Sequence, residues 1–256
     1  MTIPEVRESS NSEQWPGLHS KLFSPKKSSV QKYKDMTVGD RGWGALFRYE
    51  IMMLLFNSIP GALGLFLRQR FYRSLFQRVG RGVIFGRNIV LRQPNKILLG
   101  DDIIIDDDCL LDAKGEGNQG ITIGNMVTIG RFSSIVCKNA DITIGSHVNI
   151  GSTVKIITAN QGKIVIGNSV DIGSGCHFSG GSYDYSDPDV LPSSRRLETQ
   201  GITVEDLAWV GVGVIVLDGV TIGTKSIVGA GAVVTKDIPP NCIAAGVPAE
   251  VKKHRG

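Results

Sequence analysis

Two of the four histidines, His147 and His177, lie in a long repetitive part of the chain. Imidazole is the side-chain group best suited to proton transfer near neutral pH, because its unperturbed pKa is about 6.5. The other two, His19 and His254, lie in the flanking segments. If this protein uses a histidine as a general base, we expect His177 first and His147 second. Taken singly, each also fits an ordinary surface histidine.

The acidic residues and the cysteines do not form a metal-ligand pattern. Four cysteines are scattered without a CxxC pair, which favours reduced, structural thiols. A zinc site made of three histidines is not available, because the repetitive part contains two. The formal net charge of +4 comes without a recognised nucleic-acid-binding motif. We therefore predict no metal and no nucleic-acid partner. Six aspartates fall at positions where solvated turns are expected: Asp101, Asp102, Asp106, Asp107, Asp108 and Asp112.

A six-residue repeat must position these side chains. In hexads such as Ile142-Thr-Ile-Gly-Ser-His, the first and third residues are apolar or small, which is the alternation of a strand with one buried face. The fourth is often glycine, which tolerates a corner, and the last two are turn residues. Three hexads form an 18-residue coil, and such coils are stable only when stacked. The pattern predicts an all-β, three-sided solenoid with about six full coils, preceded by a partial coil from residue 83. The full coils are residues 97–114, 121–138, 142–159, 164–181, 202–219 and 220–237.

All interruptions of the repeat follow a third hexad, at residues 115–120, 139–141, 160–163 and 182–201. They are therefore expected at one corner of the prism. The segment 182–201 is too long for a simple turn, and loops of this length in a compact domain tend to be functional. Its tyrosines and aspartates, including Tyr185, suit sugar hydroxyl groups. A clasp on a neighbouring subunit is the alternative, and the sequence does not separate the two.

The N-terminal part differs in composition. We expect a disordered basic tail at residues 1–40, an amphipathic helical extension at 41–80, the solenoid at 81–240 and a C-terminal tail at 241–256. Helices are predicted at residues 43–56 and 62–79, separated by Pro60. Nine arginines and one glutamate lie between residues 41 and 92. Either a membrane-surface element or a cap on the solenoid fits this pattern. The apolar run is too short and broken for a transmembrane span, and no signal peptide is visible, which favours the cytoplasm.

The C-terminal hexads carry longer motifs. They read Trp209-Val-Gly, Leu217-Asp-Gly-Val-Thr-Ile-Gly, Val228-Gly-Ala-Gly-Ala-Val-Val-Thr-Lys-Asp-Ile-Pro-Pro and Ala245-Gly-Val-Pro-Ala. These motifs and the hexads resemble the hexapeptide-repeat acyltransferases, especially sugar O-acetyltransferases and the enzymes of exopolysaccharide gene clusters. The resemblance implies a left-handed parallel β-helix, a homotrimer and acetyl-CoA as acyl donor, bound in a groove between neighbouring subunits.

The same resemblance assigns residues that contact the donor. Ala230 lies in the Gly229-Ala-Gly turn, where the family's main chain contacts the pantetheine arm. Thr235 and Lys236 match the pair that meets the nucleotide phosphate, a role that suits an ammonium group. Lys253 lies where the family often has an arginine near the same phosphates.

The catalytic position departs from the family pattern. Where the family has its histidine, at the start of the long loop, this chain has Tyr183. The family's partner asparagine falls near a threonine, with Asn160 as a substitute one corner further on. A tyrosine is a poor base at its reference pKa of about 10. His177, His147 and Asp184, which follows Tyr183, are the alternatives, and Tyr185, Trp209 and Asn160 are the candidate substrate contacts.

The leading hypothesis is transfer of an acetyl group from acetyl-CoA to a sugar hydroxyl in polysaccharide or glycolipid biosynthesis. The enzyme would be cytoplasmic, on the inner face of a membrane if residues 41–80 bind lipid. One alternative is a trimeric β-helix scaffold that has lost its catalytic base. The other is N-acetylation of an amino nucleotide-sugar.

Overall fold

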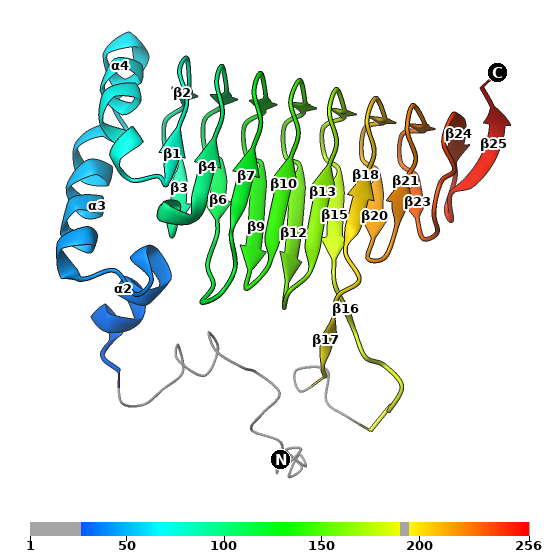
Figure 1. The fold of residues 1–256 in the computed structure, drawn as a ribbon, viewed down its shortest axis with the longest axis horizontal. Helices are drawn as coiled ribbons and strands as arrows, with labels where there is room; N and C mark the ends of the chain where they lie inside the picture. The colour runs from blue at the N-terminus through cyan, green and yellow to red at the C-terminus, as the bar shows by residue number, and fades with distance from the viewer. Residues whose placement is uncertain (1–26, 190–194, 256) are drawn as a thin grey trace, which may run out of the picture.

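The structure is a computed structural model that describes residues 27–189 and 195–255. Its main body is a parallel β-helix with three sheets, here called A, B and C, that the chain visits in turn (Figure 1). The predicted left-handed parallel β-helix with an N-terminal helical extension is confirmed. The corners between successive strands are called A–B, B–C and C–A.

Each sheet takes one strand from every full coil, and sheet B is extended by β24 and by β25, which runs antiparallel to β24. Sheet A consists of β1 (Arg78–Val79), β4 (Ile97–Leu99), β7 (Ile121–Ile123), β10 (Asp141–Ile144), β13 (Lys163–Ile166), β18 (Ile202–Val204) and β21 (Thr221–Ile222). Sheet B consists of β2 (Ile84–Phe85), β5 (Ile104–Ile105), β8 (Thr128–Ile129), β11 (Asn149–Ile150), β14 (Asp171–Ile172), β19 (Trp209–Val210), β22 (Ile227–Val228), β24 (Cys242–Ala245) and β25 (Glu250–His254). Sheet C consists of β3 (Val90–Arg92), β6 (Leu110–Asp112), β9 (Ser134–Lys138), β12 (Lys155–Ala159), β15 (His177–Gly180), β20 (Ile215–Leu217) and β23 (Val233–Val234).

The interior follows the hexad rhythm. The first and third residues of the hexads point inward, as Ile121 and Ile123 do, and are almost completely buried. Phe178 is the large aromatic side chain at such a position and is fully buried as well. All four cysteines are free and buried. Because the strands pair in register, side chains of the same hexad position stack from coil to coil and form one continuous apolar core.

The four interruptions all lie at the C–A corner, as predicted, because each separates a strand of sheet C from the next strand of sheet A. The longest extends outward as an antiparallel pair, β16 (Ser182–Tyr183) and β17 (Leu197–Glu198). Figure 1 shows this hairpin projecting from the side of the coil.

The prediction of a second helix over residues 62–79 is wrong at its C-terminal end. The helix α4 spans Gly61–Phe71, a short 3₁₀ turn η1 (Tyr72–Ser74) follows, and residues 78–79 form strand β1. Arg78 and Val79 pair with Leu98 and Leu99, so the first coil is complete and not partial. The reason is the register: Val79 and the following glycine match the Leu-Gly of the next hexad.

The expected disordered tail also contains a helix. Residues 1–26 lie outside the described residues, but α2 spans Ser29–Val38. A capping box begins it, in which Ser28 and Gln31 satisfy each other's backbone amides. Thr37 and Val38 are buried where α2 contacts β3, and a second 3₁₀ turn, η2 (Pro94–Lys96), follows that strand. Local capping and burial therefore outweigh the polar composition.

The helices α2, α3 (Trp43–Phe56) and α4 close the N-terminal end of the coil (Figure 1). Tyr72 is fully buried, meets the ring of Phe85 edge-on, and donates to Asn57 Oδ1 at 3.2 Å. The Tyr49 hydroxyl donates to the Leu91 carbonyl at 2.9 Å. These contacts make the helices a cap over the first coil. None of the described helices is long and apolar enough to span a bilayer.

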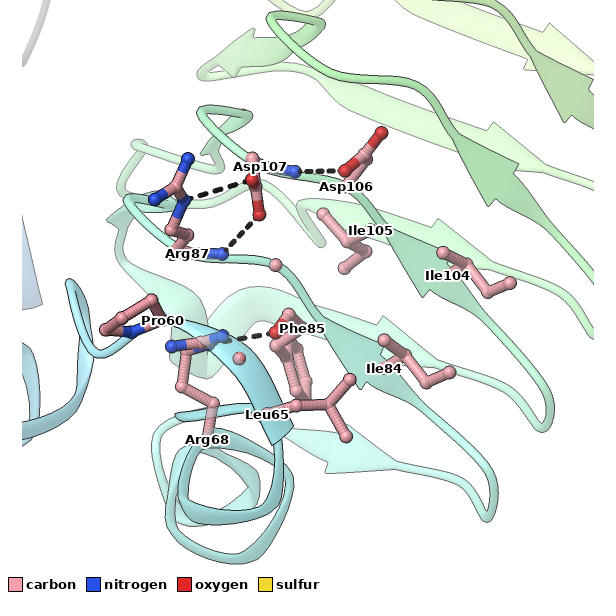
Figure 2. A pocket seen from close by; sticks show the side chains of 12 residues that line it. Pro60, Leu65, Arg68, Ile84, Phe85, Arg87, Ile104, Ile105, Asp106 and Asp107 are labelled. Carbon is pink, nitrogen blue, oxygen red and sulfur yellow. Dashed lines mark hydrogen bonds and ion pairs between the residues drawn. The ribbon is translucent and has the colours of Figure 1, made fainter. Parts of the chain in front are cut away.

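A buried arginine fastens this cap. Arg68 of α4 is 3% exposed, and its guanidinium donates to the Phe85 carbonyl at 2.9 Å (Figure 2). It also donates to the carbonyls of Ile59 at 2.7 Å and Phe56 at 3.1 Å. Burial lowers its pKa, yet three carbonyl oxygens replace the water that the cation lost. Arg68 thus connects both cap helices to the coil.

Candidate functional site

The candidate site is the outer face of sheet C together with its two corners. His177 begins β15, at an outward and half-buried position. The strand register places Lys155 of β12 beside it on one side and Ile215 of β20 on the other. Adjacent strands lie about 4.8 Å apart. The imidazole therefore lies between a cation and an apolar side chain.

This environment disfavours the charged form of the imidazole. Burial lowers the pKa of His177 below its usual value, and the positive charge of Lys155 lowers it further. At neutral pH the ring therefore has a nitrogen lone pair that can accept a proton. Lys155 was not among the predicted residues. The sequence feature that could have identified it is its hexad position: Lys155 and His177 are both the second residue of the third hexad in their coils.

The C–A corner brings the predicted loop residues together. Tyr183 lies in β16 and is 49% exposed, and Tyr185 beyond it is 78% exposed. Asn160 lies at the same corner one coil earlier, and its carbonyl accepts a hydrogen bond from Thr199 Oγ1 at 2.9 Å. That bond ties the returning arm of the long loop to the corner. The tyrosines and Asn160 therefore occupy one edge of sheet C.

Asp184 is a fully exposed carboxylate at this edge. The main-chain amide of Ser186 donates to its Oδ1 at 2.9 Å. This bond is the main cause that lowers the pKa of Asp184, with smaller contributions from the Ser186 side chain and the nearby arginines. A lowered pKa makes a carboxylate a weaker base. Asp184 is therefore a weak candidate for the proton acceptor.

The last coil places the predicted donor contacts at both corners of sheet C. Gly229 and Ala230 lie at the B–C corner, between β22 and β23, and Thr235 and Lys236 follow β23 at the C–A corner. Ala230, Thr235 and Lys236 are exposed. In sheet C, β23 is two strands from β15, which corresponds to about 10 Å along the coil axis.

Three predicted residues lie on other sides of the coil. His147 is exposed at the A–B corner, opposite sheet C. Trp209 lies on the outer face of sheet B, in a row that continues through Ile227 and Ile243 to Lys253. Within one chain, these residues are not brought to His177.

Sheet B also carries a polar row that was not predicted. Thr128 Oγ1 donates to Asn149 Oδ1 at 2.5 Å, and Asn149 Nδ2 donates to Asp171 Oδ1 at 2.8 Å. Trp209 is next to Asp171 in the register. The signal in the sequence is that each is the second residue of the middle hexad of its coil. The face beside Trp209 is thus polar and preorganised by its own hydrogen bonds.

The aspartate cluster forms ion pairs and turns. Asp107 contacts Arg87 at 3.1 Å and Arg131 at 3.2 Å. Asp112 departs from the expected solvated turn, because it lies in β6, is buried and pairs with Lys114 at 2.7 Å. Among the residues that the structure describes, no group of three His, Cys, Asp or Glu side chains is arranged to hold a metal ion.

A pocket of about 370 Å³ lies between α4 and the first two strands of sheet B (Figure 2). Its walls include Leu65, Ile84 and Ile104. None of the residues discussed above as catalytic or donor contacts lines it, so the pocket is separate from the site on sheet C.

Sequence comparison finds relatives that are named as acetyltransferases. Galactoside O-acetyltransferase of Lactococcus lactis subsp. lactis is 35% identical over 140 residues, which are 54% of this chain and 54% of that enzyme. WbbJ of Escherichia coli (strain K12), named as an O-acetyl transferase of lipopolysaccharide biosynthesis, is 29% identical over 167 residues, 64% of this chain and 74% of WbbJ. The chain spans about half the length of several curated relatives that it matches. No family model matches the chain.

Structural comparison finds the same fold. AntD, an N-acyltransferase from Bacillus cereus solved with dTDP and 3-hydroxybutyryl-CoA, superposes with a TM-score of 0.52 over 74% of this chain and 88% of AntD. At 20% identity this likeness shows the fold alone. The chain therefore shares the left-handed parallel β-helix fold, and its sequence relatives include proteins named as sugar O-acetyltransferases.

Proposed function

We propose that this protein transfers an acetyl group from acetyl-CoA to a sugar hydroxyl, in the biosynthesis of a polysaccharide or glycolipid. The observation that carries the proposal is His177, a half-buried imidazole of lowered pKa on the same sheet whose corners hold Ala230 and Lys236. The names of the sequence relatives support the acetyl donor and the sugar acceptor.

In the proposed reaction, the neutral imidazole of His177 accepts the proton of the acceptor hydroxyl. The oxygen attacks the thioester carbonyl carbon, a C–O bond forms, and the tetrahedral intermediate expels the CoA sulfur. The imidazolium returns the proton to that sulfur, which leaves as a thiol. Tyr183, Tyr185 and Asn160 at the C–A corner would bind the acceptor's other hydroxyl groups.

The donor would run along the coil axis towards its C-terminal end. Gly229 and Ala230 would contact the pantetheine arm, and Thr235 and Lys236 the nucleotide phosphates, since an ammonium is a good partner for phosphate. We further infer a homotrimer. Trp209, Lys253 and His147, which one chain keeps away from sheet C, would then serve a neighbouring subunit's site.

Two measurements test the proposal. Calorimetry with acetyl-CoA and CoA measures donor binding, and release of the CoA thiol against a panel of sugars measures transfer. We expect His177→Gln to lower kcat by about 100-fold or more with an unchanged Kd for CoA. Thr143→Val is the matched control and should retain wild-type activity, because Thr143 is likewise the half-buried second residue of a hexad but lies on sheet A. Failure to bind CoA at millimolar concentration would exclude acyl transfer.

A second candidate is N-acylation of an amino nucleotide-sugar. Tyr183 at the family's histidine position favours it, because a neutral amine attacks a thioester without prior loss of a proton. The panel should therefore include amino sugars, and thiol release with those alone would select this reaction. Normal CoA binding, no release with any acceptor and indifference to His177→Gln would instead identify a scaffold.

The proposed reaction takes place in the cytoplasm, at the inner face of a membrane that holds the growing saccharide. To test this location, cells would be separated into a membrane fraction and a soluble fraction. The protein from each fraction would then be assayed for thiol release.

A further inference from the structure

The N-terminal cap has an unpartnered apolar surface. We call it the end face and define it by six exposed side chains of α3 and α4. Their exposed fractions are Trp43 54%, Phe47 69%, Leu54 85%, Leu55 52%, Leu63 64% and Phe66 62%. Exposed apolar residues of this size are normal singly, but a contiguous group marks an interaction site.

The end face follows from the helical period. In α3, Trp43, Phe47 and Leu54 are spaced i, i+4 and i+11, which places them on one side of the helix. Leu46 and Tyr49 lie on another side of the helix and are buried, and the Tyr49 hydroxyl bonds to the coil at Leu91. A helix that is apolar on both sides is normally buried or in contact with lipid. Packing against the coil accounts for one side of α3 only.

Several exposed arginines lie on or beside the two helices that carry the end face. Arg41 precedes α3, Arg48 lies within it, and Arg70 and Arg73 stand at the end of α4 and just beyond, all exposed. The acidic side chain of the two helices is Glu50, which lies on the same side of α3 as Phe47 and Leu54 and accepts a hydrogen bond from the Tyr33 hydroxyl at 2.6 Å. Because the exposed arginines outnumber this one acidic group, the apolar surface and its surroundings complement an anionic bilayer.

We propose that the end face is a membrane-binding surface, which lays α3 and α4 in the headgroup region of an anionic bilayer. The aromatic and leucine side chains would enter the boundary of the acyl chains, and the arginines would contact lipid phosphates. The coil axis would then lead away from the membrane, with the last coils furthest from it (Figure 1). This surface is separate from the site on sheet C, so the proposal does not rest on acetyl transfer.

A second copy of the chain is a poorer occupant of this surface. In a twofold contact the same patch meets itself, so the arginines near the end face of both copies, Arg41, Arg48 and Arg70, would be brought to one interface. Bringing like charges together at an interface is unfavourable. Anionic lipids supply the opposite charge.

The test is co-sedimentation of the full chain with vesicles of phosphatidylcholine, alone or with about one third phosphatidylglycerol. We expect binding to the anionic vesicles and at least about tenfold weaker binding without the anionic lipid. The variant Leu54→Glu/Phe66→Glu should weaken binding about tenfold or more, because it places charges in the apolar contact. Met126→Glu is the matched control, since Met126 is 55% exposed on a turn of the coil, and should bind like wild type.

Two results would overturn the proposal. One is vesicle binding that Leu54→Glu/Phe66→Glu does not weaken, which would place the contact elsewhere. The other is absence of binding to the anionic vesicles; if the chain then self-associates and the same variant abolishes this, a second copy is the occupant. CoA calorimetry on the same samples keeps this outcome distinguishable from a failure of the proposed acetyl transfer.

Discussion

The two ends of the coil are closed in opposite ways. At the C-terminal end, β25 turns back antiparallel to β24 and exposes charged side chains, including Glu250, Lys252 and Lys253. At the N-terminal end, the covering helices expose Leu54 and Phe66. A stacked-repeat protein needs caps with a polar outer face. The C-terminal cap meets that requirement alone, whereas the N-terminal cap meets it only if something covers its outer side.

The forces that hold the two caps differ as well. Main-chain pairing holds β25, from Cys242 opposite His254 to Ala245 opposite Glu250. Buried side chains, above all Tyr72, hold the helices against the coil, and strand pairing contributes little there. Replacing a buried side chain should therefore destabilise the N-terminal cap more than the C-terminal cap.

The largest effect is expected from Tyr72→Ala. Tyr72 is fully buried against Phe85, and its removal leaves a cavity at the base of the cap. We expect a loss of about 3–5 kcal/mol in the free energy of unfolding. Urea denaturation followed by circular dichroism measures it. The control is Phe66→Ala on the exposed side, for which the change should stay within about 0.5 kcal/mol. Equal losses would show that the end face is packed within the protein after all.

Arg68→Met should have the next largest effect. The substitution preserves much of the apolar stem but leaves the carbonyls of Phe56, Ile59 and Phe85 without their donor. Loss of buried bonds to a charged donor predicts a destabilisation of about 2–3 kcal/mol. Hydrogen exchange should show faster opening of α4, with the later coils unchanged. Uniformly faster exchange would contradict the idea of a cap held locally.

The coil could be predicted from the sequence because its signal is periodic and redundant. Each hexad repeats the same alternation, so the inward position of Phe178 followed from counting alone. The first coil was harder, because Arg78 and Val79 lack the Ile-x-Ile pattern and become a strand through pairing with Leu98 and Leu99. Similarly, α2 depends on capping and on burial against β3, which polar composition conceals.

The site could be predicted only in part, for a geometric reason. Counting hexads places His177 outward, but its neighbour Lys155 is 22 residues away because of an inserted corner, and only the register brings them together. The same register keeps Trp209 and Lys253 on sheet B, away from Asn160 and Tyr183. Which residues of a second chain complete the site depends on docking between subunits, which the hexad pattern does not encode.

Lys236→Ala should have a smaller effect, confined to the C-terminal end. Lys236 is exposed at the C–A corner, where we propose that it meets a CoA phosphate. Loss of one exposed charge contact should weaken CoA binding by about 5- to 10-fold, or about 1–1.4 kcal/mol. Calorimetry measures the Kd. Lys225→Ala is a matched control, because Lys225 is an exposed lysine of the same coil at the A–B corner. A similar loss in both variants would indicate a general effect of charge and no phosphate contact.

The smallest effect is expected from Lys155→Met, and it concerns the pH dependence of kcat/KM. The neutral imidazole of His177 is the proposed base, so kcat/KM should fall as the pH drops through its pKa. Burial and the charge of Lys155 both lower that pKa. Without Lys155 the pKa must rise, and the acidic limb of kcat/KM should move to higher pH while the plateau rate stays the same. Lys163→Met, at an exposed lysine of sheet A, should leave the limb in place.

A merely structural role for Lys155 would lower the plateau and leave the limb where it is, so the two explanations separate in one titration. The same pH titration of kcat/KM, repeated with anionic vesicles, tests whether the N-terminal end of the coil affects the site on sheet C. The vesicles should leave the position of the limb unchanged, because β15 lies four strands beyond β3 in sheet C, roughly 19 Å along the axis. That separation exceeds the screening length of about 8 Å at physiological ionic strength. A limb that moves with added vesicles would mean that lipid binding at the N-terminal end reaches the chemistry on sheet C.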